Sequence, residues 1–152
     1  ISAKMAQTGA IIGGESSGGL AVRGHIAGKD GIYAASLLVE MLAVTGKSVS
    51  QLYREITDRY GMLYYEDTAF TMKPARKQEL QQVLFEKQEL PDFGKPIDHV
   101  SREDGCKVYF ADGSWVICRF SGTEPLLRMA AEGSSRSQAL DYIHIWKKAL
   151  DL

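Results

Sequence analysis

The sequence predicts an α/β unit followed by an α+β unit, the second built on a four-stranded antiparallel sheet with packed helices. Two observations lead to this fold class. In the first part of the chain, a short apolar strand and a glycine-rich loop precede two segments with helical periodicity. In the last third, four short strand-like runs, separated by glycine-containing turns, precede a final amphipathic helix.

The elements of the first part follow from local signals. Residues 1–7 are typical of the end of a helix, residues 10–12 form a short buried strand, and residues 13–19 form a glycine-rich loop. Asp30 is suited to cap a helix over residues 31–45. The apolar residues of that helix recur with helical spacing: Ile32, Ala35, Leu38, Val39 and Leu42.

The middle of the chain is less regular. The capping-box pattern at residues 48–51 begins a helix that ends near Gly61. Residues 62–72 are extended and aromatic, and they fit either a strand or a linker. Pro74 begins a further helix that continues to Lys87, because proline suits the first helical turn.

The last third carries the clearest supersecondary pattern. Its strand-like runs are residues 97–102, 105–110, 114–120 and 126–132. Asp-Gly pairs and a Ser-Gly-Thr turn connect these runs. A second capping box at residues 135–138 begins the final helix. The sequence therefore predicts a small sheet with one helix after it.

The two cysteines flank the predicted turn at residues 112–113. If that Asp-Gly pair is a two-residue hairpin turn, Ala111 faces Ser114, and Cys106 and Cys118 point to opposite faces of the sheet. A disulfide between them is then not expected, which fits a reducing compartment. We therefore expect a cytoplasmic protein.

Composition limits the classes of partner. The chain has 152 residues, a net charge of −1, and ordinary hydrophobic and charged fractions of 45% and 24%. Balanced charge disfavours a nucleic-acid binder, although Tyr109, Trp115 and Phe120 on the predicted sheet leave base stacking open as an alternative. No apolar run approaches the about 20 residues needed to span a bilayer, so no membrane partner is expected.

Three groups of residues have side chains suited to binding a ligand, and each group also has a purely structural interpretation. The loop at residues 13–19 combines four glycines with Glu15 and Ser17, which suit sugar hydroxyls, but it also fits a solvated loop. Near the following helix, Lys29 is a cation at a helix N-terminus, which hints at an anionic partner. His25 fits a ligand contact and a surface histidine equally well.

The third group is Arg-Phe-Ser-Gly-Thr-Glu-Pro at residues 119–125. It offers a cation, two hydroxyls and successive backbone amides, which can bind a phosphate group. An ordinary turn beside a surface arginine is the alternative, and Glu124 favours it because its carboxylate must avoid a bound phosphate. Arg128 either neutralises Glu124 or reaches the ligand. No metal-ligand spacing and no nucleophile signature occur.

The order of these motifs resembles the α-D-phosphohexomutase family, which includes phosphoglucomutases and phosphomannomutases. Residues 14–18 (Gly-Glu-Ser-Ser-Gly) resemble its sugar-specificity loop, residues 25–31 the segment after it, and residues 119–125 its phosphate-binding loop. The resemblance implies sugar contacts by Glu15, Ser17, His25 and Lys29. It implies phosphate contacts by Arg119, Ser121, Gly122 and Thr123.

The resemblance makes residues 1–66 the later part of a truncated α/β third domain and residues 67–152 the phosphate-binding fourth domain. It implies an intramolecular phosphotransferase that interconverts hexose 1-phosphate and hexose 6-phosphate through a bisphosphorylated intermediate. The family's phosphoserine and its Mg²⁺ ligands lie in earlier domains, so this fragment alone is expected to be inactive. Hexose 1,6-bisphosphate is the implied activator, and hexose phosphate and the missing N-terminal domains are the implied partners.

One position departs from the family. Several subfamilies place a histidine where this chain has Gly19, which favours the phosphoglucomutase/phosphomannomutase branch, and His25 is the candidate replacement. A stand-alone sugar-phosphate-binding module without catalysis stays open as an alternative. The chain starts at Ile1 within a helical pattern, so we expect a fragment with an exposed apolar face and with self-association or local disorder before Gly46.

Overall fold

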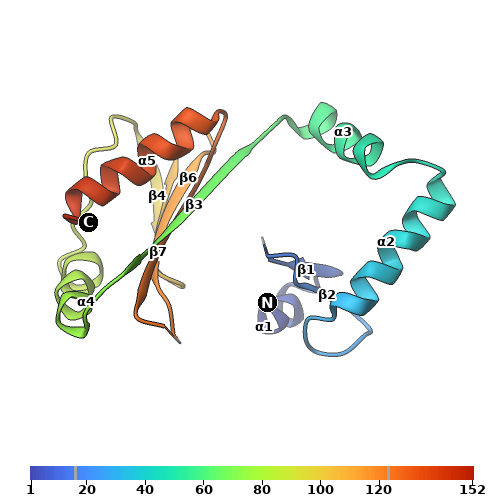
Figure 1. Ribbon diagram of the computed structural model, residues 1–152, viewed down its shortest axis with the longest axis horizontal. Helices are drawn as coiled ribbons and strands as arrows, with labels where there is room; N and C mark the ends of the chain where they lie inside the picture. The colour runs from blue at the N-terminus through green and yellow to red at the C-terminus, as the bar shows by residue number, and fades with distance from the viewer. Residues whose placement is uncertain (16, 123) are drawn as a thin grey trace. The chain divides into compact units, whose positions relative to one another are not determined.

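The structure of the chain is a computed structural model that describes residues 1–15, 17–122 and 124–152. The chain divides into two compact units, Ile1–Tyr60 and Gly61–Leu152 (Figure 1). The sequence-based boundary between residues 66 and 67 falls inside one strand, Tyr64–Thr71, which lies entirely in the second unit.

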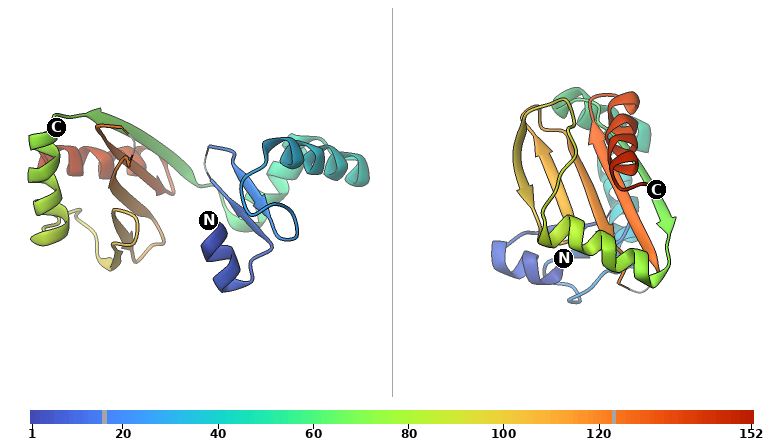
Figure 2. Two further views of the ribbon diagram at one scale, coloured as in Figure 1. Left: turned by 90° about the horizontal axis from the view of Figure 1, so that it is seen from below. Right: turned by 90° about the vertical axis from the view of Figure 1, so that its left-hand side faces the viewer.

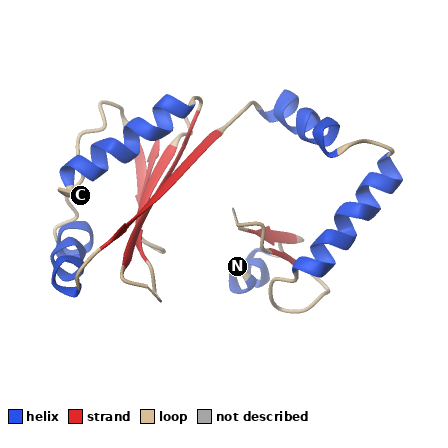
Figure 3. Ribbon diagram, in the orientation of Figure 1, coloured by secondary structure: helices blue, strands red, loops and turns tan. Residues whose placement is uncertain are grey.

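The first unit consists of short strands and two longer helices (Figure 3). Its elements are α1 (Ser2–Thr8), β1 (Ile12–Gly14), β2 (Leu20–Val22), α2 (Gly31–Thr45) and α3 (Val49–Tyr60). Strands β1 and β2 are antiparallel, with Gly13 opposite Ala21. The predicted helices are confirmed, but the glycine-rich loop connects two strands of a hairpin and does not lead directly into a helix.

Apolar side chains of the first unit are largely exposed. Neither α2 nor α3 contains a buried residue. On α2, the exposed fractions are 85% for Ile32, 66% for Val39 and 79% for Val44. The predicted exposed apolar face is thus present, whereas self-association stays a prediction. Among the described residues, no single helix is long and apolar enough to cross a membrane; α2 and α3 pass that test only together, as a pair bent by 86°.

The second unit is a five-stranded antiparallel sheet with helices (Figures 1 and 2). Its elements are β3 (Tyr64–Thr71), α4 (Pro74–Gln81), the π-helical turn η1 (Gln82–Glu86), β4 (Ile97–Ser101), β5 (Cys106–Phe110), β6 (Trp115–Phe120), β7 (Leu126–Gly133) and α5 (Arg136–Ala149). The strand order is β3-β7-β6-β5-β4. The predicted α+β class is confirmed.

The predicted strand count was one too low. The segment that fitted either a strand or a linker forms β3, which pairs with β7 along its whole length, from Tyr64 opposite Gly133 to Thr71 opposite Leu126. Its alternate residues are less exposed, as expected for a strand with one covered face. This pairing makes β7 an interior strand, and β7 leads away from the candidate phosphate loop.

Helix α5 covers one face of the sheet (Figure 2). Ser135 caps it by accepting a hydrogen bond from the backbone N–H of Gln138 at 3.2 Å, as the capping box predicts. The largest fully buried side chains of the core include Trp146, Leu84, Leu127 and Met129. The core therefore lies between α5, the sheet and the helical turn after α4.

The hairpin between β5 and β6 corrects the predicted cysteine geometry. Its loop has three residues, because Tyr109 pairs with Trp115 and the backbone N–H of Phe110 donates to the carbonyl of Ser114 at 2.9 Å. One extra loop residue shifts the register by one, so Cys106 lies directly opposite Cys118 and not on the other face. Both thiols are free and buried, and burial raises the pKa of each.

Candidate functional site

The loop between β1 and β2 is a tight turn that begins with Glu15. The backbone N–H of Glu15 donates to the carbonyl of Gly19 at 2.9 Å, and the N–H of Gly18 donates to the carbonyl of Glu15 at 3.0 Å. Gly18 has φ +89°, a conformation that side chains disfavour. Ser17 Oγ lies 3.4 Å from Glu15 Oε2, so the turn places a hydroxyl beside the carboxylate.

Lys29 joins this turn from the segment before α2. Its ammonium forms an ion pair with the Glu15 carboxylate, and this hydrogen bond is the main reason why the pKa of Glu15 is lowered. A Cβ on Gly19 would lie 2.5 Å from Lys29 Cδ, so any other residue at this position would require the lysine side chain to move. The structure thus brings Glu15, Ser17 and Lys29 together.

His25 lies apart from these three contacts. Its Nε2 lies 2.8 Å from Asp30 Oδ2, and its ring stacks on Tyr33 with centroids 4.0 Å apart. Asp30 also caps α2 by accepting hydrogen bonds from the N–H groups of Ile32 and Tyr33, both at 3.0 Å. The contact with His25, followed by these backbone donors, lowers the pKa of Asp30. The cap predicted from the sequence is confirmed.

The candidate phosphate loop connects β6 to β7. Ser121 is only 8% exposed, and both its backbone and its side chain are hydrogen-bonded. Its N–H donates to the carbonyl of Leu126 at 2.9 Å, and its Oγ accepts from the N–H of Glu124 at 3.2 Å. Gly122 is exposed, and a Cβ added to it would meet no atom within 4 Å. Thr123, the last predicted phosphate contact, lies outside the described residues.

Among the described residues, three cations lie in this loop's flanking strands or contact its backbone. Arg119 Nη1 lies 2.6 Å from Asp104 Oδ2, and Arg128 Nη2 lies 2.9 Å from Glu124 Oε2. Glu124 is thus neutralised by Arg128, one of the two roles that the sequence left open. The third cation is Lys77 of α4, whose Nζ lies 3.5 Å from the Ser121 carbonyl oxygen.

Sequence reasoning missed Lys77 because it lies 44 residues before Ser121 and belongs to no motif. Its only local feature is a place in the helix that Pro74 begins. The loop therefore combines a buried serine, an exposed glycine and nearby cations, a combination suited to a small anion such as a phosphate group.

No metal centre is found in the part of the chain that the structure describes. Within residues 1–15, 17–122 and 124–152, no three His, Cys, Asp or Glu side chains gather closely enough to hold an ion. The described donors do not form a site for Mg²⁺. The expectation that the metal's ligands lie elsewhere stays a prediction.

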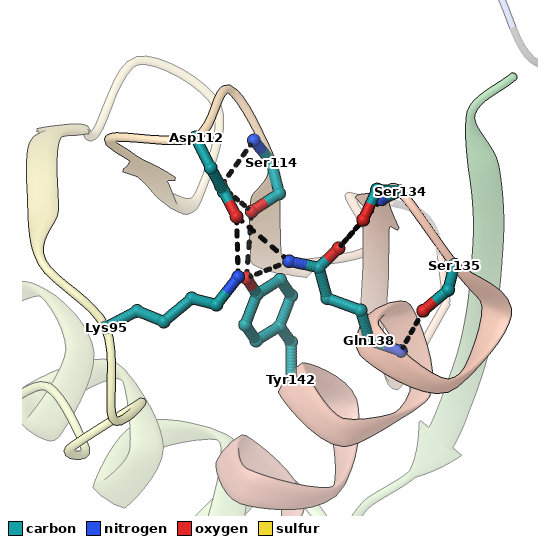
Figure 4. Close-up of polar contacts among 7 residues, drawn as sticks. All are labelled: Lys95, Asp112, Ser114, Ser134, Ser135, Gln138 and Tyr142. Carbon is teal, nitrogen blue, oxygen red and sulfur yellow. Dashed lines mark hydrogen bonds and ion pairs between the residues drawn. The ribbon is translucent and has the colours of Figure 1, made fainter. Parts of the chain in front are cut away.

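A second polar cluster has a structural role (Figure 4). Asp112 accepts from Lys95 at 2.5 Å and from Gln138 at 3.1 Å, and it also accepts from the hydroxyl of Ser114. Ser114 in turn shares a 2.8 Å hydrogen bond with Tyr142 of α5. These partners, first Lys95, lower the pKa of Asp112. The cluster ties the β5–β6 turn to α5.

The aromatic residues considered for base stacking do not share one face of the sheet. Tyr109 and Trp115 face each other across β5 and β6, and Lys107 Nζ already lies 3.8 Å from the Trp115 ring centroid. Phe120 packs against the buried core instead. Because Trp115 and Phe120 are five positions apart on one strand, they point to opposite faces.

Two family models match the chain. The model described as phosphoglucomutase/phosphomannomutase, alpha/beta/alpha domain III, matches residues 1–60. The model described as the C-terminal domain of the same family matches residues 68–145. The two matches together include every candidate residue of both loops.

Curated relatives match over most of this chain. A phosphoglucomutase/phosphomannomutase of Thermococcus kodakarensis is 32% identical over 140 residues, which are 92% of this chain and 28% of the relative. A probable phosphoglucosamine mutase of Methanothermobacter thermautotrophicus is 31% identical over 142 residues, with coverage of 92% and 29%. The chain thus spans less than a third of the length of these relatives.

A solved structure agrees in fold. The crystal structure of a putative phosphomannomutase from Thermus thermophilus superposes with a TM-score of 0.69 at 23% identity, and it covers 100% of this chain and 29% of that one. At this identity the likeness concerns the fold. Together with the match of the C-terminal domain model to half of the chain, these findings identify the protein as a member of the phosphoglucomutase/phosphomannomutase family, with the family's last two domains represented in its two units.

Proposed function

We propose that this chain is the sugar- and phosphate-binding part of a mutase that interconverts hexose 1-phosphate and hexose 6-phosphate through a bisphosphorylated intermediate. The observation that carries the proposal is the loop after β6. There a buried Ser121 and an exposed Gly122 follow Arg119, in a chain that belongs to the phosphohexomutase family.

The phosphate end of the substrate binds this loop. Arg119 supplies charge-assisted hydrogen bonds, and Ser121, Gly122 and Thr123 supply hydroxyl and backbone donors. Such bonds contribute about 1.5–3 kcal/mol each, so three or four are enough to hold a phosphate monoester. Lys77, whose Nζ already lies beside the Ser121 carbonyl, adds a positive charge on the α4 side of the loop.

The sugar hydroxyls bind the loop between β1 and β2. The Glu15 carboxylate accepts hydrogen bonds, Ser17 donates or accepts, and Lys29 donates. In the free protein Lys29 and Glu15 satisfy each other, and both side chains are at least 40% exposed, so a sugar can reach them. His25 adds a further sugar contact, although its Nε2 is paired with Asp30 in the free protein.

These residues position the substrate and take no part in making or breaking bonds. Anchoring the end of the sugar that does not react lowers the entropic cost of reaching the transition state. The phosphoserine and the Mg²⁺ that neutralises the transferred phosphoryl group belong to other domains in this proposal, and hexose 1,6-bisphosphate serves as intermediate and activator. The isolated chain is therefore inactive, and we place the working enzyme in the cytoplasm.

The proposal is tested with the chain joined to its preceding domains. Conversion of glucose 1-phosphate to glucose 6-phosphate is expected, and Arg119→Ala should lower kcat/KM by about 10-fold to 100-fold, the equivalent of one charge-assisted bond. Arg54→Ala, on the exposed surface of α3, is the matched control and should leave kcat/KM unchanged. Equal losses in the two variants would refute the role of the loop.

A stand-alone binding module is the second candidate. It is favoured only if the preceding sequence lacks a serine loop and an acidic metal-binding loop. In that case glucose 1-phosphate binds, Arg119→Ala weakens binding, and no conversion occurs with any added domain.

A further inference from the structure

The turn between β4 and β5 brings an acidic side chain to Arg119. Asp104 Oδ2 lies 2.6 Å from Arg119 Nη1, and the exposed fractions of the two side chains are 76% and 43%. An ion pair this exposed adds little to stability and opens at little cost. Its position matters more, because Arg119 is the cation that precedes the candidate phosphate loop.

Gly105 explains how the turn comes so close to β6. It has φ +96°, and a Cβ there would lie 2.5 Å from Arg119 Cβ and 2.7 Å from the Cys118 carbonyl oxygen. Any side chain at this position would push the turn away from the strand. The backbone therefore packs directly against Arg119 and delivers the neighbouring Asp104 carboxylate to the guanidinium.

We propose that Asp104 is an internal counter-ion of Arg119, which a phosphate group displaces when it binds the loop. The inference rests on the proposed phosphate-binding role of Arg119. A carboxylate and a phosphate that share one guanidinium lie within a few ångströms of each other and repel. Phosphate carries the larger charge and gains the loop's backbone donors, whereas Asp104 can turn into solvent.

The consequence for a mutase concerns release. Asp104 lowers the affinity of the loop for phosphate, and it forms its ion pair with Arg119 again when the phosphate leaves. A bisphosphorylated intermediate that reorients must give up one phosphate and present the other to the same loop. An internal counter-ion makes this exchange faster at the cost of affinity.

The test compares the binding of glucose 1-phosphate by the chain and four variants, with amide NMR shifts in the loop as the readout. Asp104→Asn keeps the shape of the side chain, removes its charge, and should lower Kd by about threefold to fivefold. Glu103→Gln removes the same charge from the same turn, and no contact between Glu103 and Arg119 is found among the described residues. It should change Kd by less than about twofold.

Arg119→Ala and the double variant with Asp104→Asn complete the comparison. Arg119→Ala should weaken binding, and Asp104→Asn should then have no further effect, because its partner is gone. Unchanged amide spectra of α5, which is remote from the substituted turn in sequence, check that each variant still folds.

The outcomes separate the two proposals. If Asp104→Asn weakens binding, Asp104 holds Arg119 in place for the ligand. If Asp104→Asn changes Kd no more than Glu103→Gln does, Asp104 has no specific role. Either result refutes the counter-ion but leaves the phosphate loop standing. If the chain binds nothing at millimolar ligand, or Arg119→Ala binds as the wild type does, the phosphate loop itself is refuted. A purely structural Asp104 would not tighten binding more than Glu103→Gln does when its charge is removed.

Discussion

The aliphatic side chain of Lys29 passes over Gly19, and its ammonium forms an ion pair with the carboxylate of Glu15. This contact joins the segment before α2 to the turn between β1 and β2. It also lowers the pKa of Glu15 from its ordinary value of 4.5. Two candidate sugar-binding groups are thus held together in the free protein, and the missing side chain at position 19 permits it.

Gly19→Ala should separate the two groups. The new Cβ would lie 2.5 Å from Lys29 Cδ, so the lysine must move, and the pKa of Glu15 should rise toward 4.5. A carbon-detected NMR titration of the Glu15 carboxyl group measures this directly. Gly28→Ala is the matched control, because a Cβ there meets no atom within 4 Å. An unshifted Glu15 pKa in Gly19→Ala would show that the glycine is not required.

Asp112→Asn should destabilise the second unit at neutral pH. The buried hydroxyl of Ser114 loses a charged acceptor, which costs about 1 kcal/mol after allowance for the 44% exposure of the Asp112 side chain. The folded-state pKa of Asp112 lies below the ordinary 3.8, so its contribution is complete above pH 3.8 and is lost as pH falls through the folded value.

Urea unfolding, followed by fluorescence of Trp115 and Trp146, measures this difference. The difference in the free energy of unfolding between wild type and Asp112→Asn should shrink below about pH 4. Glu89→Gln, an exposed charge change in the same unit, should be neutral at every pH. A difference that stays constant down to pH 2 would mean that the ionised carboxylate is not what stabilises the cluster.

The exposed face of α2 should cause self-association. Three of its apolar residues are at least 66% exposed: Ile32 and Val39, which lie two turns apart on one side of the helix, and Val44 on another side. Exposed patches of this kind drive association in water. Sedimentation velocity should therefore show a larger species as the concentration rises, and Val39→Lys should reduce it. Lys147→Ala, on α5 of the other unit, should not. A monomer at all concentrations would contradict this expectation.

The sequence predicted most elements because their signals are local. Ser135 capped α5 and Asp30 capped α2 as expected, since each cap depends only on residues within the next helical turn. Turn glycines and alternating apolar residues were enough to place β4 to β7 within one or two residues.

Relationships between distant segments could not be predicted in the same way. The register of Cys106 and Cys118 depended on whether Ala111 belonged to a strand or to the loop. The strand Tyr64–Thr71 was ambiguous until its pairing with β7 was known.

In the candidate site, too, local motifs were predictable from the sequence and contacts between distant segments were not. Both loops were found from their residues and from the resemblance to the family, and Lys29 and Arg128 were named with them, but Lys77 and Asp104 were not. Lys77 and Asp104 reach the phosphate loop from 44 and 15 residues away along the chain, and neither distance leaves a sequence pattern. Gly19 was noted as a departure from the family, but its role as space for Lys29 emerges only from the fold.

The most direct test is an amide-resolved NMR titration of the chain with glucose 1-phosphate, with unphosphorylated glucose as the control. Phosphate binding by the loop predicts shifts at residues 121–123 that glucose does not cause and that Arg119→Ala weakens about 10-fold or more in apparent Kd. Shifts of equal size with glucose, or shifts that Arg119→Ala leaves unchanged, would contradict a phosphate-binding loop after β6.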